Sequence, residues 1–180
     1  RTSGKRGDPF GISCFVMPID TAGFSIDEWL WTFNMPTDHP RVSLKDVWLP
    51  DSAILGEIDK GLNVAQHFVH ENRIRQAASS LGTARFCIQA SVDYANERIT
   101  FGKPLSMNQS IQFKVAELSI DYEMIKALTM TVAEEMDQLS KIEVSKLLSA
   151  KVAMCNYRAN TLACDAADYA MQVHGGIGYS

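Results

Sequence analysis

Residues 109–138 read QSIQFKVAELSIDYEMIKALTMTVAEEMDQ and repeat a mainly apolar residue at alternating intervals of four and three. This spacing places the repeated residues along one stripe of an α-helix, which is the pattern by which one helix packs against another. The repeated residues are Ile111, Val115, Leu118, Tyr122, Ile125, Thr129, Val132 and Met136. We therefore predict a long helix over this stretch and a helical partner packed against it.

Two further long helices are predicted on either side of this stretch. Glycine and proline become rare from Gly61 to about Arg98, and the Gly-Lys-Pro break at residues 102–104 separates that helix from the next. Helical spacing resumes near Glu143 and ends at the glycine pair 175–176, because glycine readily takes the left-handed conformation that ends many helices. Long helices joined by short connections predict an antiparallel bundle.

The first 55 residues favour strands and turns instead of helices. Short runs rich in β-forming residues, at 11–18 and 41–50, are closed by prolines and separated by turn residues. They predict a short antiparallel sheet, the end of a β-domain. The predicted fold class is therefore α+β and mainly α.

Composition narrows the possible function classes. The formal net charge is −4 with both signs spread along the chain, which argues against a nucleic-acid-binding face. Charged residues interrupt the apolar runs before any of them could span a bilayer. The four cysteines form no CxxC pair and no zinc spacing with the histidines, so we expect a reducing compartment and no bound metal. The start at Arg1 and the glycine loop at the end predict a segment cut at both ends.

Three motifs in order carry a resemblance to a known family. Residues 47–62 contain Val-Trp-Leu-Pro, Ile-Leu-Gly-Glu and Lys-Gly-Leu, and they resemble the sheet-to-bundle junction of acyl-CoA dehydrogenases. Residues 96–105, NERITFGKPL, followed by Asn108 and Gln109, are similar to the most recognisable block of that family. Residues 171–179, MQVHGGIGY, match a third block at the right distance. The three motifs cover nearly the whole chain.

The resemblance implies a dimeric or tetrameric enzyme with an N-terminal helical domain, a middle β-domain and a C-terminal four-helix bundle. Residues 1–55 would be the end of the middle, β-barrel-like domain. Residues 56–180 would be the FAD-binding, oligomerising helical bundle domain, with three of its helices covered. The family desaturates an acyl-CoA thioester: a carboxylate removes the α-proton, the β-hydrogen passes as hydride to FAD, and an electron-transfer flavoprotein usually accepts the electrons.

The resemblance also assigns seven residues to FAD binding. They are Arg98, Thr100, Phe101, Gln109, Gln172, Gly175 and Gly176. A fixed guanidinium matches the oxygens of a pyrophosphate, and adjacent glycines let a backbone approach a ligand closely. A cation at a helix end, a residue that plugs the bundle end and a helix stop would explain the same residues without a ligand.

For the substrate, the resemblance places Arg73 beside the acyl-CoA thioester, and it gives His70 a position where relatives often carry an acidic residue that helps to bind CoA. Some relatives carry the catalytic glutamate directly before this arginine, but here the residue is Asn72, which cannot abstract a proton. Glu71 is adjacent, and one helical step turns a side chain by about 100°, so it is a weak candidate for the base. The base is expected beyond Ser180.

Two alternatives stay open at this point. One is an acyl-CoA oxidase or a nitroalkane-oxidising relative, which shares the fold and passes electrons to oxygen. The other is a non-catalytic helical assembly module that has lost its base, and Asn72 keeps it open. The compartment would be cytoplasmic in a bacterium and mitochondrial or peroxisomal in a eukaryote.

Overall fold

The computed structural model describes residues 1–33, 35 and 37–180, which form two compact units, Arg1–Ala65 and Gln66–Ser180. The mainly helical α+β fold class predicted from the sequence is confirmed. Within the described part of the chain, none of the helices has an apolar stretch long enough to cross a membrane.

The first unit contains two antiparallel pairs of strands. β1 (Cys14–Phe15) pairs with β4 (Ile54–Leu55), and β2 (Phe24–Trp29) pairs with β3 (Pro40–Leu44). The expectation of a short antiparallel sheet is therefore correct, and none of the described pairs closes into a barrel. Val42 and Leu44 are exposed, so the β2–β3 ribbon buries little apolar surface within its own unit.

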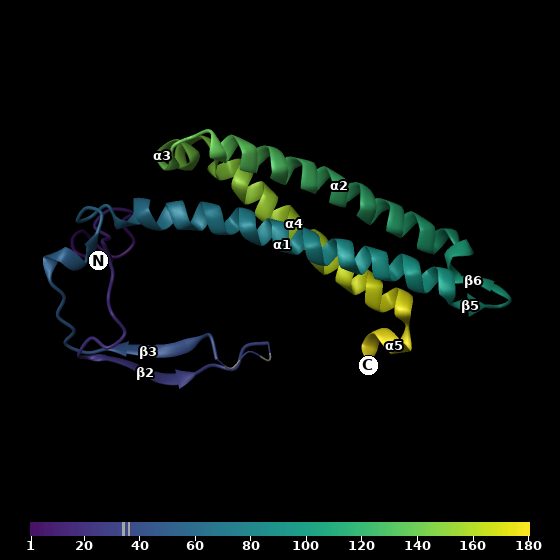
Figure 1. Cartoon of the computed structure of the whole chain (residues 1–180), viewed down its shortest axis with the longest axis horizontal. Coiled ribbons are helices and arrows are strands. Elements are labelled where there is room, and N and C mark those ends of the chain that lie inside the picture. The colour runs from purple at the N-terminus through teal and green to yellow at the C-terminus, as the bar shows by residue number, and fades with distance from the viewer. Residues whose placement is uncertain (34, 36) are drawn as a thin grey trace. The chain divides into compact units, whose positions relative to one another are not determined.

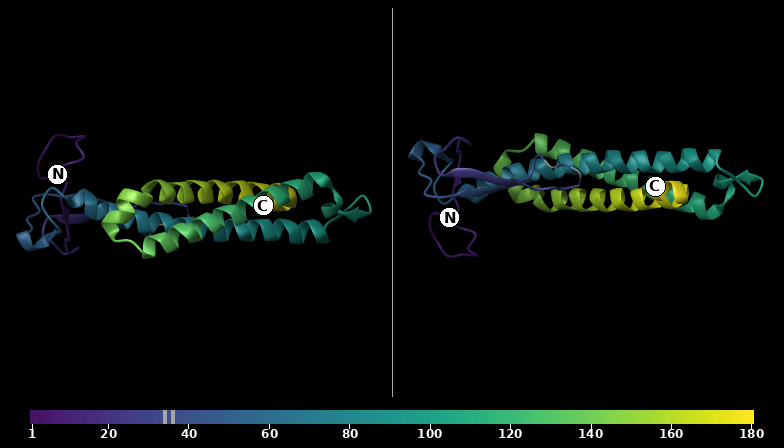
Figure 2. Two further views of the ribbon diagram at one scale, coloured as in Figure 1. Left: turned by 90° about the horizontal axis from the view of Figure 1, so that it is seen from above. Right: turned by 90° about the horizontal axis from the view of Figure 1, so that it is seen from below.

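Three long helices make up most of the second unit: α1 (Gly61–Glu97), which starts in the first unit, α2 (Gln109–Asp137) and α4 (Ser149–His174). Figures 1 and 2 show them extending along one another with short connections at their ends. α1 and α2 end within one residue of the predicted limits, because the spacing of apolar residues and the breaks at glycine and proline were unambiguous there.

A small hairpin connects α1 to α2. β5 (Ile99–Thr100) pairs with β6 (Lys103–Pro104), and Phe101 and Gly102 at its tip have φ of 50° and 79°. Positive φ at both central residues is typical of the two-residue turn that suits a hairpin. The 3₁₀ turn Leu105–Met107 then leads into α2.

The connection from α2 to α4 contains an irregular helix. α3 (Lys141–Glu143) is followed by a π-helical segment, Val144–Leu148, before the regular α-helix resumes at Ser149. The predicted third helix therefore starts two residues earlier than expected and is interrupted once. A π-helical turn holds an extra residue and departs from the regular spacing of an α-helix.

A capping box starts α3. The backbone N–H of Glu143 donates to the Ser140 hydroxyl oxygen at 3.4 Å, and the Ser140 backbone N–H and hydroxyl donate to the Glu143 carboxylate at 2.9 and 2.6 Å. These bonds hold the pKa of Glu143 below its ordinary value because they stabilise the ionised carboxylate. The capping box therefore contributes stability at neutral pH that is lost as the pH falls through the lowered pKa of Glu143.

Replacing Ser140 with alanine is expected to lower the Tm by about 2 °C at neutral pH, because a side-chain N-cap is lost. The difference from the unmodified protein should shrink in acid, where Glu143 is protonated in both. Thermal melts followed by circular dichroism over a pH series measure this. Ser110→Ala, in the first turn of α2, is the matched control, and an equal loss in both variants would show that the capping box has no special effect.

The core of the second unit lies along the seam between the three helices. Small side chains from α1 and α4 are fully buried there, among them Ala77, Ala84 and Ala159. They let the helices approach closely enough for the Ser80 hydroxyl of α1 to donate to the Asn160 side-chain oxygen of α4 at 2.6 Å. Leu162, Val132 and Val152 are the largest apolar side chains in this seam that are almost completely shielded from solvent.

Candidate functional site

The end of the second unit where α1 meets the β5–β6 hairpin and α4 stops contains a hollow of about 390 Å³, here called the end hollow. Its polar and glycine lining consists of Tyr94, Arg98, Thr100, His174, Gly175 and Gly176. Leu105, Val173 and Ile177 complete it with apolar side chains. Residues separated by about 80 positions in the sequence therefore form one site.

Backbone hydrogen bonds fix the position of Arg98 at the rim of the end hollow. Its N–H donates to the Tyr94 carbonyl oxygen at 2.9 Å, which continues the pattern of α1 by one residue. Its carbonyl oxygen accepts from the Leu105 N–H at 2.8 Å, across the base of the hairpin. The exposed guanidinium therefore extends from a backbone that is held on both sides.

The glycine pair forms the opposite wall. Gly175 has φ of 60° and ψ of −132°, a conformation that residues with a side chain rarely adopt, and its N–H donates to the Gln172 carbonyl oxygen. Apart from its chain neighbours and the local helix backbone, a Cβ atom built on Gly175 or Gly176 would meet no atom within 4 Å. A side chain at either position would instead extend into open space beside the hollow, which is the space that a ligand needs.

His174 and Tyr94 lie against each other in the same lining. Their ring centroids are 4.3 Å apart with an interplanar angle of 25°, so the rings are stacked. The Nδ1 atom of His174 is 2.8 Å from the Ala170 carbonyl oxygen. Sequence reasoning missed both residues, and the only signal was that His174 directly precedes the glycine pair.

The end hollow brings together four of the seven residues that the resemblance assigned to FAD: Arg98, Thr100, Gly175 and Gly176. The other three lie outside its lining. Phe101 is fully exposed at the hairpin tip, Gln109 is the first residue of α2, and Gln172 is exposed in the last turn of α4. Their assignment to FAD stays a prediction.

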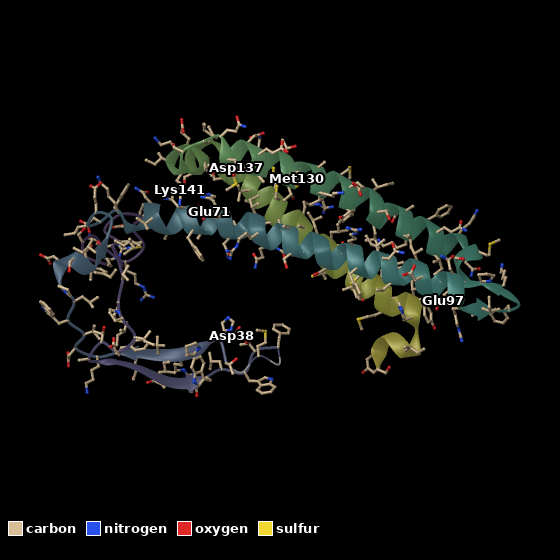
Figure 3. All side chains as sticks on the ribbon, in the orientation of Figure 1. Asp38, Glu71, Glu97, Met130, Asp137 and Lys141 are labelled. Atoms are coloured by element: carbon tan, nitrogen blue, oxygen red, sulfur yellow. The ribbon has the colours of Figure 1, made fainter. Side chains whose placement is uncertain are left out.

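A second hollow, of about 370 Å³, lies at the opposite end of the same unit and is here called the far hollow. Its lining consists of His67, His70, Glu71, Met136, Asp137, Leu139, Lys141 and Val144. Figure 3 labels Glu71, Asp137 and Lys141 near this end, and Glu97 marks the end at which α1 approaches the end hollow.

Two contacts define the chemistry of the far hollow. His70 is only 4% exposed, and its Nδ1 atom lies 3.5 Å from the Ser145 hydroxyl of the π-helical segment. The Glu71 carboxylate forms an ion pair with the Lys141 ammonium group at 3.3 Å. The far hollow is therefore lined by both acidic and basic side chains.

Asn72 and Arg73, which follow His70 closely on α1, form hydrogen bonds with residues outside the far hollow. Arg73 is half-buried and lies outside the lining of the far hollow, and its carbonyl oxygen accepts from the Asn156 amide at 3.2 Å. The Asn72 side-chain oxygen accepts from Arg75 at 3.1 Å. Of the two residues that the resemblance assigned to the substrate, His70 lines the far hollow and Arg73 does not, and their contact with acyl-CoA stays a prediction.

The cysteines offer no reactive thiolate in the helical unit's interior. Burial raises the pKa of the Cys87 and Cys155 thiols, which keeps them protonated at neutral pH. In the part of the chain that the structure describes, no three His, Cys, Asp or Glu side chains gather as candidate metal ligands.

Comparisons with known proteins show which sequences and folds this chain resembles. Residues 59–180 match the family model described as acyl-CoA dehydrogenase, C-terminal domain. The short-chain specific acyl-CoA dehydrogenase of Megasphaera elsdenii is 30% identical over 180 residues, which are 99% of this chain and 45% of that protein. The human mitochondrial short-chain specific acyl-CoA dehydrogenase is 31% identical over 172 residues, covering 94% of this chain and 40% of that protein.

A solved structure shows the same architecture. The butyryl-CoA dehydrogenase of Megasphaera elsdenii superposes with a TM-score of 0.83 and 28% sequence identity, over 99% of this chain and 45% of that chain. The chain thus spans less than half the length of these relatives.

Proposed function

This chain belongs to the acyl-CoA dehydrogenase family, and we propose that it contributes the C-terminal helical part of an FAD-dependent enzyme that desaturates an acyl-CoA thioester between its α and β carbons. Residues 1–55 would be the end of the middle β-domain, and residues 56–180 would be the bundle domain.

The observation that carries the proposal is the convergence of Arg98, Thr100, Gly175 and Gly176 on the end hollow. These residues fit the diphosphate part of FAD. Arg98 offers a planar set of N–H donors that matches phosphate oxygens, and Thr100 offers a hydroxyl. The glycines leave room for a ligand, and none of the described lining residues is a carboxylate that would repel an anion.

FAD, when bound, supplies the hydride acceptor for the β-hydrogen. The part played by this chain would be to hold the diphosphate through Arg98 and Thr100, so that the dinucleotide has one fixed position. The packed helices would provide a rigid wall, which matters because hydride transfer requires close and constant alignment of the reacting atoms. His70 and Arg73 would contact the acyl-CoA.

We assign removal of the α-proton to a carboxylate that these residues do not supply. A general base works best when it is desolvated and poised near neutral pH. The Glu71 side chain is instead 56% exposed and paired with Lys141. Asn72, where some relatives carry the base, has no basic group.

Glu71→Gln is expected to change kcat by less than about twofold, because the ion pair with Lys141 is exposed and the residue takes no part in proton transfer. Loss of a general base typically costs about 10²-fold or more in rate. Steady-state rates with an acyl-CoA substrate decide between these values. Glu123→Gln is the matched control, since Glu123 is also an exposed glutamate paired with a lysine. A loss of about a hundredfold in Glu71→Gln alone would identify Glu71 as the base.

We also propose a homo-oligomer, a dimer or tetramer, and an electron-transfer flavoprotein as electron acceptor. Large apolar side chains remain exposed along α2, including Phe113, Ile120 and Met124 at 58–61%. Exposed apolar stripes of this kind often mark interaction surfaces.

The proposed activity can be tested with the purified protein and FAD. Anaerobic addition of a short acyl-CoA should bleach the flavin absorbance, and an electron-transfer flavoprotein should restore it. Stoichiometric hydrogen peroxide in air would replace the dehydrogenase assignment with an oxidase. A colourless protein that gains no flavin absorbance would favour a non-catalytic assembly module.

A further inference from the structure

We infer that His174 is a further ligand-binding residue of the end hollow, held in place by Tyr94, and that it contacts the anionic diphosphate part of the dinucleotide alongside Arg98. The inference deepens the proposed function and rests on it.

Two restraints fix the imidazole ring of His174. One ring face is covered by the Tyr94 ring, at 4.3 Å between centroids. The Nδ1 atom lies 2.8 Å from the Ala170 carbonyl oxygen, a partner that can only accept, so Nδ1 carries the hydrogen. A ring with a stacked face and an engaged Nδ1 has little freedom to rotate. Tyr94 is therefore a positioning residue for His174.

The polar atom of the ring that remains for a ligand is Nε2. His174 lines the same hollow as Arg98 and the glycine pair, so a molecule bound there meets Nε2 as well as the guanidinium. With Nδ1 already bearing a hydrogen, the neutral ring presents Nε2 as an acceptor, and the protonated ring presents an N–H donor. Only the protonated ring can donate to a phosphate oxygen.

The helix dipole and a bound anion favour the protonated, donor form of His174, whereas the Arg98 cation opposes it. Among the residues that line the end hollow from α1, the hairpin, α4 and α5, the titratable ones are Tyr94, Arg98 and His174. Arg98 is a permanent cation, and the Tyr94 side chain carries no positive charge. His174 lies in the last turn of α4, where the helix dipole favours a cation. A bound diphosphate would add its own negative charge beside the ring.

It follows that this site should bind FAD more tightly as the pH falls through the range in which histidine gains its charge. FAD is a suitable probe because its diphosphate is esterified at both ends and does not change its own charge in that range. The protonated ring would add one charge-assisted hydrogen bond, which corresponds to a gain of about tenfold in affinity.

The test is FAD binding to the purified protein, followed by flavin fluorescence anisotropy between about pH 6 and about pH 8. The unmodified protein should bind about tenfold more tightly at the lower pH. His174→Gln should bind with an affinity that is nearly independent of pH. Tyr94→Leu should flatten the profile in the same way, whereas Tyr94→Phe, which keeps the stacked ring, should preserve it. His67→Gln, in the far hollow, is the matched control and should also preserve it.

The outcomes separate the inference from the proposed function. If the unmodified protein binds no FAD at any pH, the proposed function fails. If it binds FAD and Arg98→Ala weakens binding, but His174→Gln and Tyr94→Leu keep the full pH dependence, the proposed function stands and the inference is overturned. A profile that is flattened equally by His67→Gln would also overturn it. Thermal melts of each variant show that the comparison is made between folded proteins.

Discussion

Arg98→Ala is expected to weaken FAD binding about a hundredfold, the largest effect on binding of any single substitution in the end hollow. The reason is that Arg98 is the permanent cation among the described residues that line this hollow. Charge-assisted hydrogen bonds from a guanidinium to phosphate are about twice as strong as neutral ones, and among the described lining residues Arg98 alone offers a planar set of several donors. Fluorescence titration with FAD measures the dissociation constant directly.

Arg85→Ala is the control for this substitution. Arg85 lies on the same helix, is exposed, and lines neither the end hollow nor the far hollow. It should leave the dissociation constant unchanged. Equal weakening by the two variants would mean that the net positive charge of the helix matters rather than the position of Arg98. Arg98→Lys, which keeps the charge but not the planar donors, should fall between the two.

Leu162→Ala is expected to lower the free energy of unfolding of the helical unit by about 3 kcal/mol. Leu162 is 2% exposed in the seam where α4 packs against its neighbours. Removing the buried methyl groups loses their transfer free energy, and the packed helices cannot collapse fully into the space that remains. Urea denaturation followed by the helical circular dichroism signal measures the change.

Met154→Ala on the same helix provides the comparison, because Met154 is 56% exposed. It should cost less than about 1 kcal/mol. If both substitutions cost the same, the seam is not the main source of stability for α4. A small effect of Leu162→Ala would mean that the helices repack around the shortened side chain.

The second and third long helices could be predicted from the sequence because their apolar residues recur at helical spacing over about seven turns, and the first because glycine and proline are rare in it. In α2, Leu118, Ile125, Thr129 and Val132 belong to the predicted stripe, and all four are buried. The first unit was harder to predict. Its strands are short, and residues such as Val42 that alternate as if half-buried are exposed within that unit. A local alternation of apolar and polar residues indicates a strand, but the burial of its side chains depends on what the strand packs against.

The end hollow was predicted only in part. Arg98, Thr100 and the glycine pair were identified through resemblance, and their convergence requires two helix ends to meet in space, which no local pattern encodes. The stacking of Tyr94 on His174 was missed for the same reason, since 80 residues separate the two rings. His70 was assigned to the substrate, but its burial against Ser145 depends on the π-helical segment, which has no signature in the composition of residues 144–148.

That π-helical segment also has a consequence for how related chains compare. Val144, Leu148 and Val152 are all buried although they follow one another at two successive steps of four. In a regular α-helix each such step overshoots a full turn by about 40°, so the three would spread over about 80° of the helix surface. A π-helical turn holds more residues than an α-helical turn, so it compensates for this rotation and keeps the three residues on one face. A homologue with a regular helix here would therefore need one residue fewer to bring these three residues to the same face.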